Sequence, residues 1–243
     1  MKPSEMQLED RVKEAVAGNR KALEDVIEAI KGEAYNLSVR FFCHLPDAQD
    51  ACQEILVKIV TNLSKFSYQS SFKTWVYRVA TNHLLNAKRT VYEQLSFEEG
   101  AAHLKEGLTH TDYAGADSKL LEEEVKITCT TSMLVCLSRS LRLAYLLGEI
   151  LEFDSGEASD ILDIKAATFR KRLSLARQKI RDFMSNQCGL FNPKNPCRCK
   201  KQINYSIAVS WFDPKNLNFA NEGLLRAKNE IEFFMDEVAI FHS

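Results

Sequence analysis

Hydrophobic and polar positions along this 243-residue chain recur mainly at helical spacing. Apolar side chains separated by three and four residues run through most of the sequence, and no clear run alternates apolar with polar residues. Glycine and proline are few, whereas leucine, isoleucine, valine, alanine, glutamate and lysine are plentiful. We therefore predict an all-α protein.

Two consecutive helices are predicted between residues 47 and 89. The first begins at Pro46 and Asp47, because proline and aspartate favour a first helical turn. The second begins after Ser70 and Ser71, because a serine hydroxyl caps free backbone N–H groups. The predicted buried positions are Ile55, Leu56, Ile59, Val60 and Leu63 in the first helix and Phe72, Val76, Val79, Ala80 and Leu84 in the second.

Each of these helices carries a second face of distinctive composition. The first has an acidic ridge formed by Asp47, Asp50, Gln53 and Glu54. The second has Trp75, Arg78 and Asn82 in one row, beside Lys73, Tyr77 and Thr81. A ring, a guanidinium and an amide supply stacking, phosphate charge and base-edge hydrogen bonds for unpaired bases. The alternative is that Trp75 and Tyr77 are core residues and the other side chains are solvated.

A helix-turn-helix is predicted in the last third of the chain. After a core helix over residues 133–153, a short helix over 157–162 and a turn over 163–165 precede a longer helix from about Ala166. Seven cations and no acid occur between Lys165 and Arg181. If about five of them neutralise phosphates, the logarithm of DNA affinity falls with log salt at a slope of roughly −4 to −5. The alternative is a solvated basic face.

Both segments resemble bacterial sigma-70 family factors, in particular the extracytoplasmic-function (ECF) group. The match to region 2 of that group comprises Asp47, Ala48, Asp50, Gln53, Glu54, Ser70, Ser71, Phe72, Thr74, Trp75, Tyr77, Arg78, Ala80 and Asn82. Residues 131–184 are similar to region 4. Asp163 and Ala167 replace glycines that are common in the group, and Leu175 replaces a usual arginine.

The resemblance implies a sigma factor that binds core RNA polymerase and directs promoter recognition, DNA melting and transcription initiation. The implied polymerase contacts are the β′ clamp helices and the β flap, with Asp47, Asp50, Gln53 and Glu54 on the clamp helices. The implied −10 DNA-binding surface is the face over residues 73–82 with the loop over residues 67–71, and its implied site residues are Ser70, Lys73, Trp75, Tyr77, Arg78 and Asn82. The implied −35 DNA-binding residues are Thr168, Arg170, Lys171, Arg172 and Arg177. An anti-sigma factor is a further implied partner.

The predicted organisation is two helical domains joined by a linker, with a small C-terminal extension. Residues 1–90 form region 2, residues 91–130 an acidic solvated linker with a short helix near 119–127, and residues 131–184 the region 4 helix-turn-helix. Residues 185–243 lie beyond the resemblance. In them, residues 203–212 fit a strand or a buried helical turn, and residues 224–241 form an amphipathic helix. We expect this extension to dock on region 2 or region 4 as a regulator.

The seven cysteines, an odd number scattered through predicted helices, indicate a reducing compartment rather than a disulfide framework. Cys43, Cys52, Cys129 and Cys136 are predicted to be small core residues. Cys188, Cys197 and Cys199 gather near basic residues, so they are candidate zinc ligands or a thiol switch. A fourth ligand is not evident and would have to be His242 or Cys136. The alternative is free thiols in a basic turn.

Several classes of protein do not fit this sequence. No stretch approaches the roughly 18 apolar residues of a membrane span, and the N-terminus has no apolar signal region, so we expect a cytoplasmic protein. No nucleophile with its base, glycine-rich phosphate loop or complete metal motif occurs, so we expect neither an enzyme nor a cofactor other than zinc. The alternative function is a helix-turn-helix regulator or a thiol or zinc sensor without initiation activity.

Overall fold

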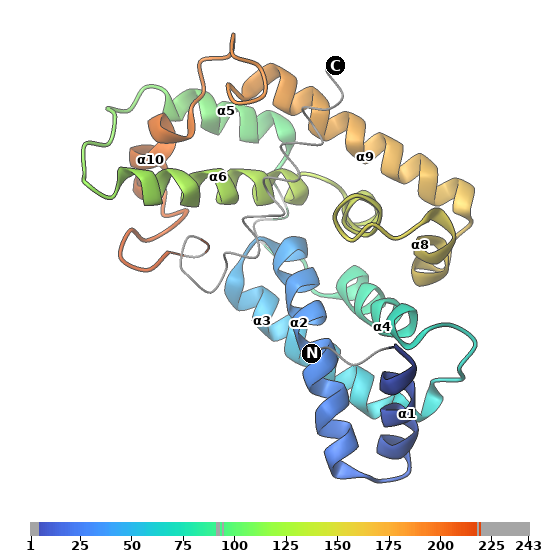
Figure 1. Cartoon of the computed structure of the whole chain (residues 1–243). Coiled ribbons are helices and arrows are strands. Elements are labelled where there is room, and N and C mark those ends of the chain that lie inside the picture. Colours follow the sequence, from blue (N-terminus) through green and yellow to red (C-terminus); the bar gives the residue numbers. More distant parts are fainter. Residues whose placement is uncertain (1–4, 91–92, 94, 218, 220–243) are drawn as a thin grey trace. The chain divides into compact units, whose positions relative to one another are not determined.

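A computed structural model describes residues 5–90, 93, 95–217 and 219 (Figure 1). The described residues form helices and two isolated β-bridges, with no strand, so the predicted all-α class is confirmed. The chain divides into two compact units, Met1–Val91 with Arg142–Leu173, and Tyr92–Leu141 with Ser174–Ser243. In the described part of the chain, no helix is both long and apolar enough to cross a membrane.

The first unit contains both of the helices that were predicted between residues 47 and 89. Its elements are α1 (Glu5–Val16), α2 (Arg20–Phe42), α3 (Leu45–Thr61), a 3₁₀ turn (Leu63–Lys65), α4 (Phe72–Asn86), most of α7 (Arg139–Tyr145), a π-helical segment (Leu146–Ile150), α8 (Ser155–Leu162) and the first part of α9 (Ala166–Gln187). Pro46 lies in the first turn of α3, and the Ser71 hydroxyl accepts a hydrogen bond from the Thr74 amide at 3.0 Å. Both predicted helix starts are therefore confirmed.

The core of this unit lies where the apolar stripes of its helices meet. Helix α2 packs between α1 and α3, and α4 packs against α3 and α8. The predicted stripe positions Ile55, Ile59, Phe72 and Leu84 are fully buried, because each faces a neighbouring helix. The stripe positions at the margins of the core, Leu56, Val60 and Val79, are half-buried.

Arg142 is a charged side chain inside this core, with an exposed fraction of 1%. Its Nη1 donates a hydrogen bond of 2.6 Å to the carbonyl oxygen of Phe41, and its guanidinium lies 4.7 Å from the centre of the Phe41 ring. Phe41 belongs to the last turn of α2, where carbonyl groups lack partners within the helix and the helix dipole is negative. The guanidinium therefore caps α2 from a helix about 100 residues further along the chain.

Replacing Arg142 by leucine is expected to lower the free energy of unfolding by about 2 to 3 kcal/mol. The change removes a hydrogen bond from a charged donor and leaves a buried carbonyl without that donor. Urea denaturation measures the difference, and Arg20→Leu is the matched control because the Arg20 side chain is 91% exposed. Equal stability of the two variants would mean that the guanidinium does not cap α2.

The second unit corrects the prediction of a solvated linker over residues 91–130. It contains α5 (Phe97–Gly107), α6 (Ser118–Val135), α10 (Cys199–Ala208) and the later part of α9. Helix α10 packs on both α5 and α6 (Figure 1). Apolar side chains from α6, α10 and the following loop form a shared core, namely Leu121, Val125, Ile203 and Phe212. The segment was taken for a linker because its apolar positions find their partner only in α10, some 80 residues later in the chain.

The described part of the C-terminal extension is a structural component of this unit. Residues 203–208 belong to a helix, which decides the open choice between strand and helix. The Gln202 amide donates to the Leu104 carbonyl at 2.9 Å, and the buried Glu124 carboxylate accepts from the Phe219 amide at 2.9 Å. Helix α10 thus covers α5 and α6, whereas we expected docking on region 2 or region 4. The amphipathic helix predicted over residues 224–241 lies outside the described residues.

Candidate nucleic-acid interface

The acidic ridge predicted on α3 lies on the surface of its unit. Asp50, Gln53 and Glu54 are exposed, whereas Asp47 is half-buried and its carboxylate lies 2.8 Å from the Nδ1 of His44. Val57 follows on the same helical face, seven residues after Asp50, and 60% of its surface is exposed. Sequence reasoning missed Val57, although its spacing from Asp50 was a visible signal. Val57 therefore adds one exposed apolar side chain to the acidic ridge.

The reading face predicted on α4 is partly exposed. Lys73 and Asn82 are exposed, while Ser70, Trp75 and Arg78 are half-buried. The Trp75 ring stacks on that of Phe72, with centroids 5.8 Å apart and planes inclined by 21°. Tyr77 differs, because it is 4% exposed and its ring packs edge-on against Phe153 with centroids 4.9 Å apart. Burial raises the pKa of the Tyr77 hydroxyl.

Tyr68 adds an exposed aromatic ring next to this face. It lies in the loop before α4 with a φ of 59°, and 43% of its surface is exposed. Its ring centroid lies 4.4 Å from that of Phe66, and the Phe66 ring in turn contacts Trp75 at 5.7 Å. The sequence assigned the loop over residues 67–71 to −10 DNA but did not single out Tyr68. The available signal was a single aromatic side chain in a short polar loop.

The helix-turn-helix forms as predicted, with α8 and α9 joined over residues 163–165. Helix α8 begins with a capping box. The Asp154 side chain accepts a hydrogen bond from the Glu157 backbone amide, and the Glu157 side chain accepts one from the Asp154 backbone amide. Asp163 ends the helix in the left-handed region, with φ 51° and ψ 51°. The left-handed conformation favours glycine, which is common at this position in the family that the sequence resembles. Aspartate tolerates this conformation better than most other residues. The substitution therefore preserves the turn.

Helix α9 presents its predicted DNA-binding residues outward. Phe169 and Leu173 are buried, while Thr168, Arg170, Lys171 and Arg177 are exposed and Arg172 is half-buried. Leu175, which stands where the resembling group usually has arginine, is 42% exposed. An outward row of cations and a hydroxyl on the second helix of such a motif suits phosphates and base edges in a major groove.

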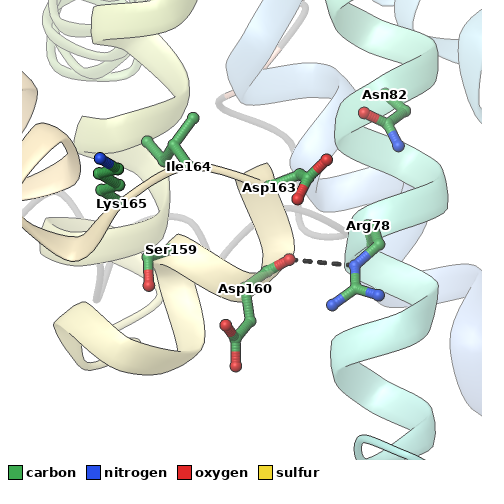
Figure 2. A pocket seen from close by; sticks show the side chains of 7 residues that line it. All are labelled: Arg78, Asn82, Ser159, Asp160, Asp163, Ile164 and Lys165. Carbon is green, nitrogen blue, oxygen red and sulfur yellow. Dashed lines mark hydrogen bonds between the residues drawn. The ribbon is translucent and has the colours of Figure 1, made fainter.

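A pocket of about 560 Å³ lies between α4 and the helix-turn-helix, within the first unit (Figure 2). It is lined by Arg78, Asn82, Ser159, Asp160, Asp163, Ile164 and Lys165. The Arg78 Nε donates a hydrogen bond of 3.0 Å to the carbonyl oxygen of Asp160, as Figure 2 shows. Two predicted readers of single-stranded DNA thus face the α8 end of the helix-turn-helix in this arrangement.

The candidate zinc ligands all lie in the second unit. Cys188 and Cys197 are neighbours in a parallel backbone bridge, and Cys199 is the first residue of α10. Among the residues with described positions, no three ligand-type side chains are spaced as a formed metal site. The Cys136 thiol, one candidate fourth ligand, is 3.4 Å from the Ser132 carbonyl of its own helix. The other, His242, lies outside the described residues.

A helical unit with an acidic ridge, an aromatic reading face and a basic helix-turn-helix defines a DNA-binding transcription protein. Comparison with known proteins agrees, because residues 26–91 match the family described as Sigma-70 region 2. The chain is 28% identical over 181 residues to the ECF RNA polymerase sigma factor SigW of Bacillus subtilis, covering 73% of this chain and 96% of SigW. It is 27% identical over 186 residues to the RNA polymerase sigma-H factor of Pseudomonas aeruginosa, covering 72% of this chain and 91% of that protein.

A solved structure shares the fold. CnrH, in complex with the cytosolic domain of CnrY, matches 72% of this chain and 95% of CnrH with a TM-score of 0.51 and 17% identity. Residues 26–91 thus match the sigma-70 region 2 family, and the chain is similar over about 70% of its length to ECF sigma factors.

Proposed function

We propose that this protein is a transcription initiation factor that binds core RNA polymerase and directs it to promoter DNA. The observation that carries the proposal is the region 2 match over residues 26–91 in the same chain as a helix-turn-helix. A simple repressor needs the second feature but has no use for the first. The protein acts by binding rather than by catalysis, and its site of action is the cytoplasm.

Separate surfaces of the protein bind core polymerase and promoter DNA. The α3 ridge of Asp50, Gln53 and Glu54, extended by Val57, docks on the β′ clamp helices. The basic side of α9, with Arg170 and Lys171, holds the −35 duplex, and region 4 also meets the β flap. An anti-sigma factor that controls access to these surfaces is a further proposed partner.

Single-stranded −10 DNA binds along α4 and the loop before it. Tyr68 and Trp75 supply stacking surfaces, Lys73 supplies charge, and Arg78 and Asn82 supply hydrogen bonds to bases. Tyr77 supports the face from within the core, because its ring is buried against Phe153. This assignment replaces the direct DNA contact that we predicted for Tyr77 with a structural role.

The hydrogen bond from Arg78 to the Asp160 carbonyl has a consequence for this binding. A base cannot use the Arg78 Nε–H while that donor is engaged with α8. The arrangement in Figure 2 is therefore closed for this one donor, and −10 DNA can use the Nε–H only when α8 has separated from α4. Core polymerase can supply the free energy for this step by binding the separated form more tightly.

Replacing Tyr68 by alanine is expected to weaken binding of the single-stranded −10 promoter strand by about 5- to 150-fold, which corresponds to about 1 to 3 kcal/mol for loss of one base stack. Fluorescence anisotropy of a labelled oligonucleotide with the polymerase holoenzyme measures the change. Tyr68→Phe is the control, because it retains the ring and should bind like the wild type. Equal binding by the alanine variant would remove Tyr68 from the site.

The experiment that tests the function itself is run-off transcription with core polymerase on a library of promoters. Transcripts that start at a defined distance from a −35/−10 pair, and only when the protein is added, support an initiation factor. A protein that binds duplex DNA but starts no transcript with core enzyme is a helix-turn-helix regulator, and the proposal is then wrong.

A further inference from the structure

His83 is a buried histidine of α4, and α3 supplies two charged side chains beside its ring. The His83 side chain is 6% exposed. The Nζ of Lys58 lies 2.8 Å from the Nδ1 of His83, and the Oε2 of Glu54 lies 3.8 Å from the same nitrogen. Glu54 and Lys58 are one helical turn apart on α3. A single ring nitrogen is therefore within reach of both a cation and an anion.

The short contact with Lys58 determines the state of the ring. A lysine ammonium can only donate hydrogen bonds, so the Nδ1 of His83 must accept through its lone pair. The ring is therefore neutral in this arrangement and carries its proton on Nε2. At 3.8 Å the Glu54 carboxylate is too distant for a hydrogen bond, and an unprotonated Nδ1 has no hydrogen to donate to it.

This arrangement keeps Glu54 on the surface of the protein. Its side chain is 67% exposed, and it belongs to the acidic ridge that the proposed function assigns to core polymerase. Lys58 follows Glu54 on α3 and comes directly after the exposed Val57. While the ring is neutral, it holds the Lys58 ammonium against α4 and leaves the Glu54 carboxylate to the ridge.

A proton on Nδ1 exchanges these two neighbours. It occupies the lone pair that accepts from Lys58, and the two positive charges then repel each other. The same Nδ1–H becomes a donor toward Glu54, whose carboxylate needs to approach by only about 1 Å to accept a charge-assisted hydrogen bond. Glu54 then turns from the ridge toward α4, and the Lys58 ammonium is released to the surface.

The pH at which this exchange occurs lies on the acidic side of neutrality. Burial and the Lys58 ammonium lower the pKa of the His83 ring, and Glu54 opposes them. Helix α4 also packs on α1, α2 and α8, but in the described part of the chain the charges that act on the ring are those of the two α3 residues. The ring is therefore neutral at neutral pH and gains its proton only as the pH falls below the usual histidine pKa of about 6.5.

We propose that His83 is a positioning residue for polymerase docking, which exchanges Lys58 for Glu54 when it becomes protonated. The neutral ring leaves the ridge with its full set of carboxylates. The protonated ring pairs with Glu54, so the ridge loses one negative charge and gains the positive charge of Lys58. The proton comes from solvent and returns to it when the pH rises, so no other reactant is needed. The inference rests on the proposed docking of the ridge on core polymerase.

The affinity of the full-length protein for core polymerase, measured from about pH 8 to about pH 5, tests this role. His83→Asn is the informative variant, because the asparagine Oδ1 can accept from Lys58 in place of Nδ1 but does not titrate. It should bind like the wild type at about pH 8. At about pH 5 the wild type should bind about 10-fold more weakly than His83→Asn, the loss expected for one important interface side chain.

The ratio of the two affinities at each pH removes the response of the polymerase itself to pH, and circular dichroism at each pH checks the helical content of both proteins. A ratio that stays constant while binding is measurable would overturn the proposal.

NMR titration of the free protein is a second test, which needs neither polymerase nor a variant of His83. The side-chain carboxyl carbon of Glu54 should titrate together with the His83 ring. Lys58→Met should raise the pKa of the ring, because it removes a nearby positive charge. Lys65→Met is the matched control and should leave the titration unchanged, since the Lys65 ammonium donates to Asn62 instead.

A Glu54 carboxyl group that does not respond to the titration of His83 would contradict the exchange, and so would a ring pKa that Lys58→Met leaves unchanged. Failure of the proposed function has a different signature. In that case Glu54 and the ring titrate together, but core polymerase binds the protein at no pH, and the docking role of His83 is wrong together with that of the ridge.

Discussion

The double substitution Asp50→Ala/Glu54→Ala is expected to abolish transcription that depends on this protein. Both carboxylates are exposed on α3, so their removal does not disturb the core of the first unit. If they form the centre of the polymerase contact, the affinity for core enzyme should fall by about 30-fold or more, the ratio for about 2 kcal/mol at an interface hot spot. Fluorescence titration with core polymerase measures the affinity, and run-off transcription measures the consequence.

The matched control is Glu24→Ala/Glu28→Ala. It removes two exposed carboxylates of α2 that take part in surface ion pairs with Arg20 and Lys31, and such pairs contribute little to stability. The net charge changes equally in both double variants. If both bind polymerase like the wild type, the ridge is not the docking surface. If both lose affinity equally, the effect comes from overall charge rather than from the ridge.

The second large effect is expected for Arg170→Ala/Lys171→Ala in α9. Both side chains are exposed on the second helix of the helix-turn-helix. Loss of one base-reading arginine costs about 1 to 3 kcal/mol, so −35 duplex affinity should fall by at least about 5-fold. Loss of two phosphate contacts should also reduce the slope of log affinity against log salt by about 1.8. Anisotropy titrations at several salt concentrations measure both quantities.

Arg20→Ala/Lys21→Ala removes the same charge from exposed positions of α2 and serves as the control. The α9 variant should bind core polymerase with wild-type affinity, which separates its defect from that of the α3 variant. An unchanged salt slope would exclude Arg170 and Lys171 from the phosphate contacts. A loss that is equal for −35 and unrelated duplexes would mean that these residues position the helix without reading bases.

The first unit was largely predictable because its signals are local. Helix α3 begins at a proline and α4 at a serine cap, and their buried stripes follow the helical repeat without interruption. The turn of the helix-turn-helix was predictable as well, although its conformation was not. A left-handed Asp163 can be read only from the backbone, since the sequence at this position lacks the usual glycine.

The sequence predicted only in part which residues of the candidate surfaces are exposed. Amphipathic spacing places a residue on a helical face, but it does not say whether a neighbouring segment covers that face. Tyr77 lies beside Trp75 and Arg78 in the pattern, yet Phe153 covers its ring from 76 residues away. The exposed Val57 shows the opposite case, because it is an apolar residue outside the predicted buried stripe that lies on the surface beside the acidic ridge.

The second unit was not predictable, because its apolar positions pair across long distances in sequence. Leu121 and Val125 have their partners in Ile203 and Phe212, and acidic residues between them weaken the local helical pattern.

This long-range pairing has a consequence for biosynthesis. Helix α6 leaves the ribosome well before the segment that covers it, since Leu121 and Phe212 are separated by about 90 residues. At a translation rate of about 5 to 20 residues per second, the apolar side of α6 stays uncovered for roughly 5 to 18 s, until α10 and the following loop have been synthesised. The nascent chain therefore passes through a stage in which the segments of the first unit, residues 1–91 and 142–173, are already synthesised while this surface is still open to chaperones and proteases.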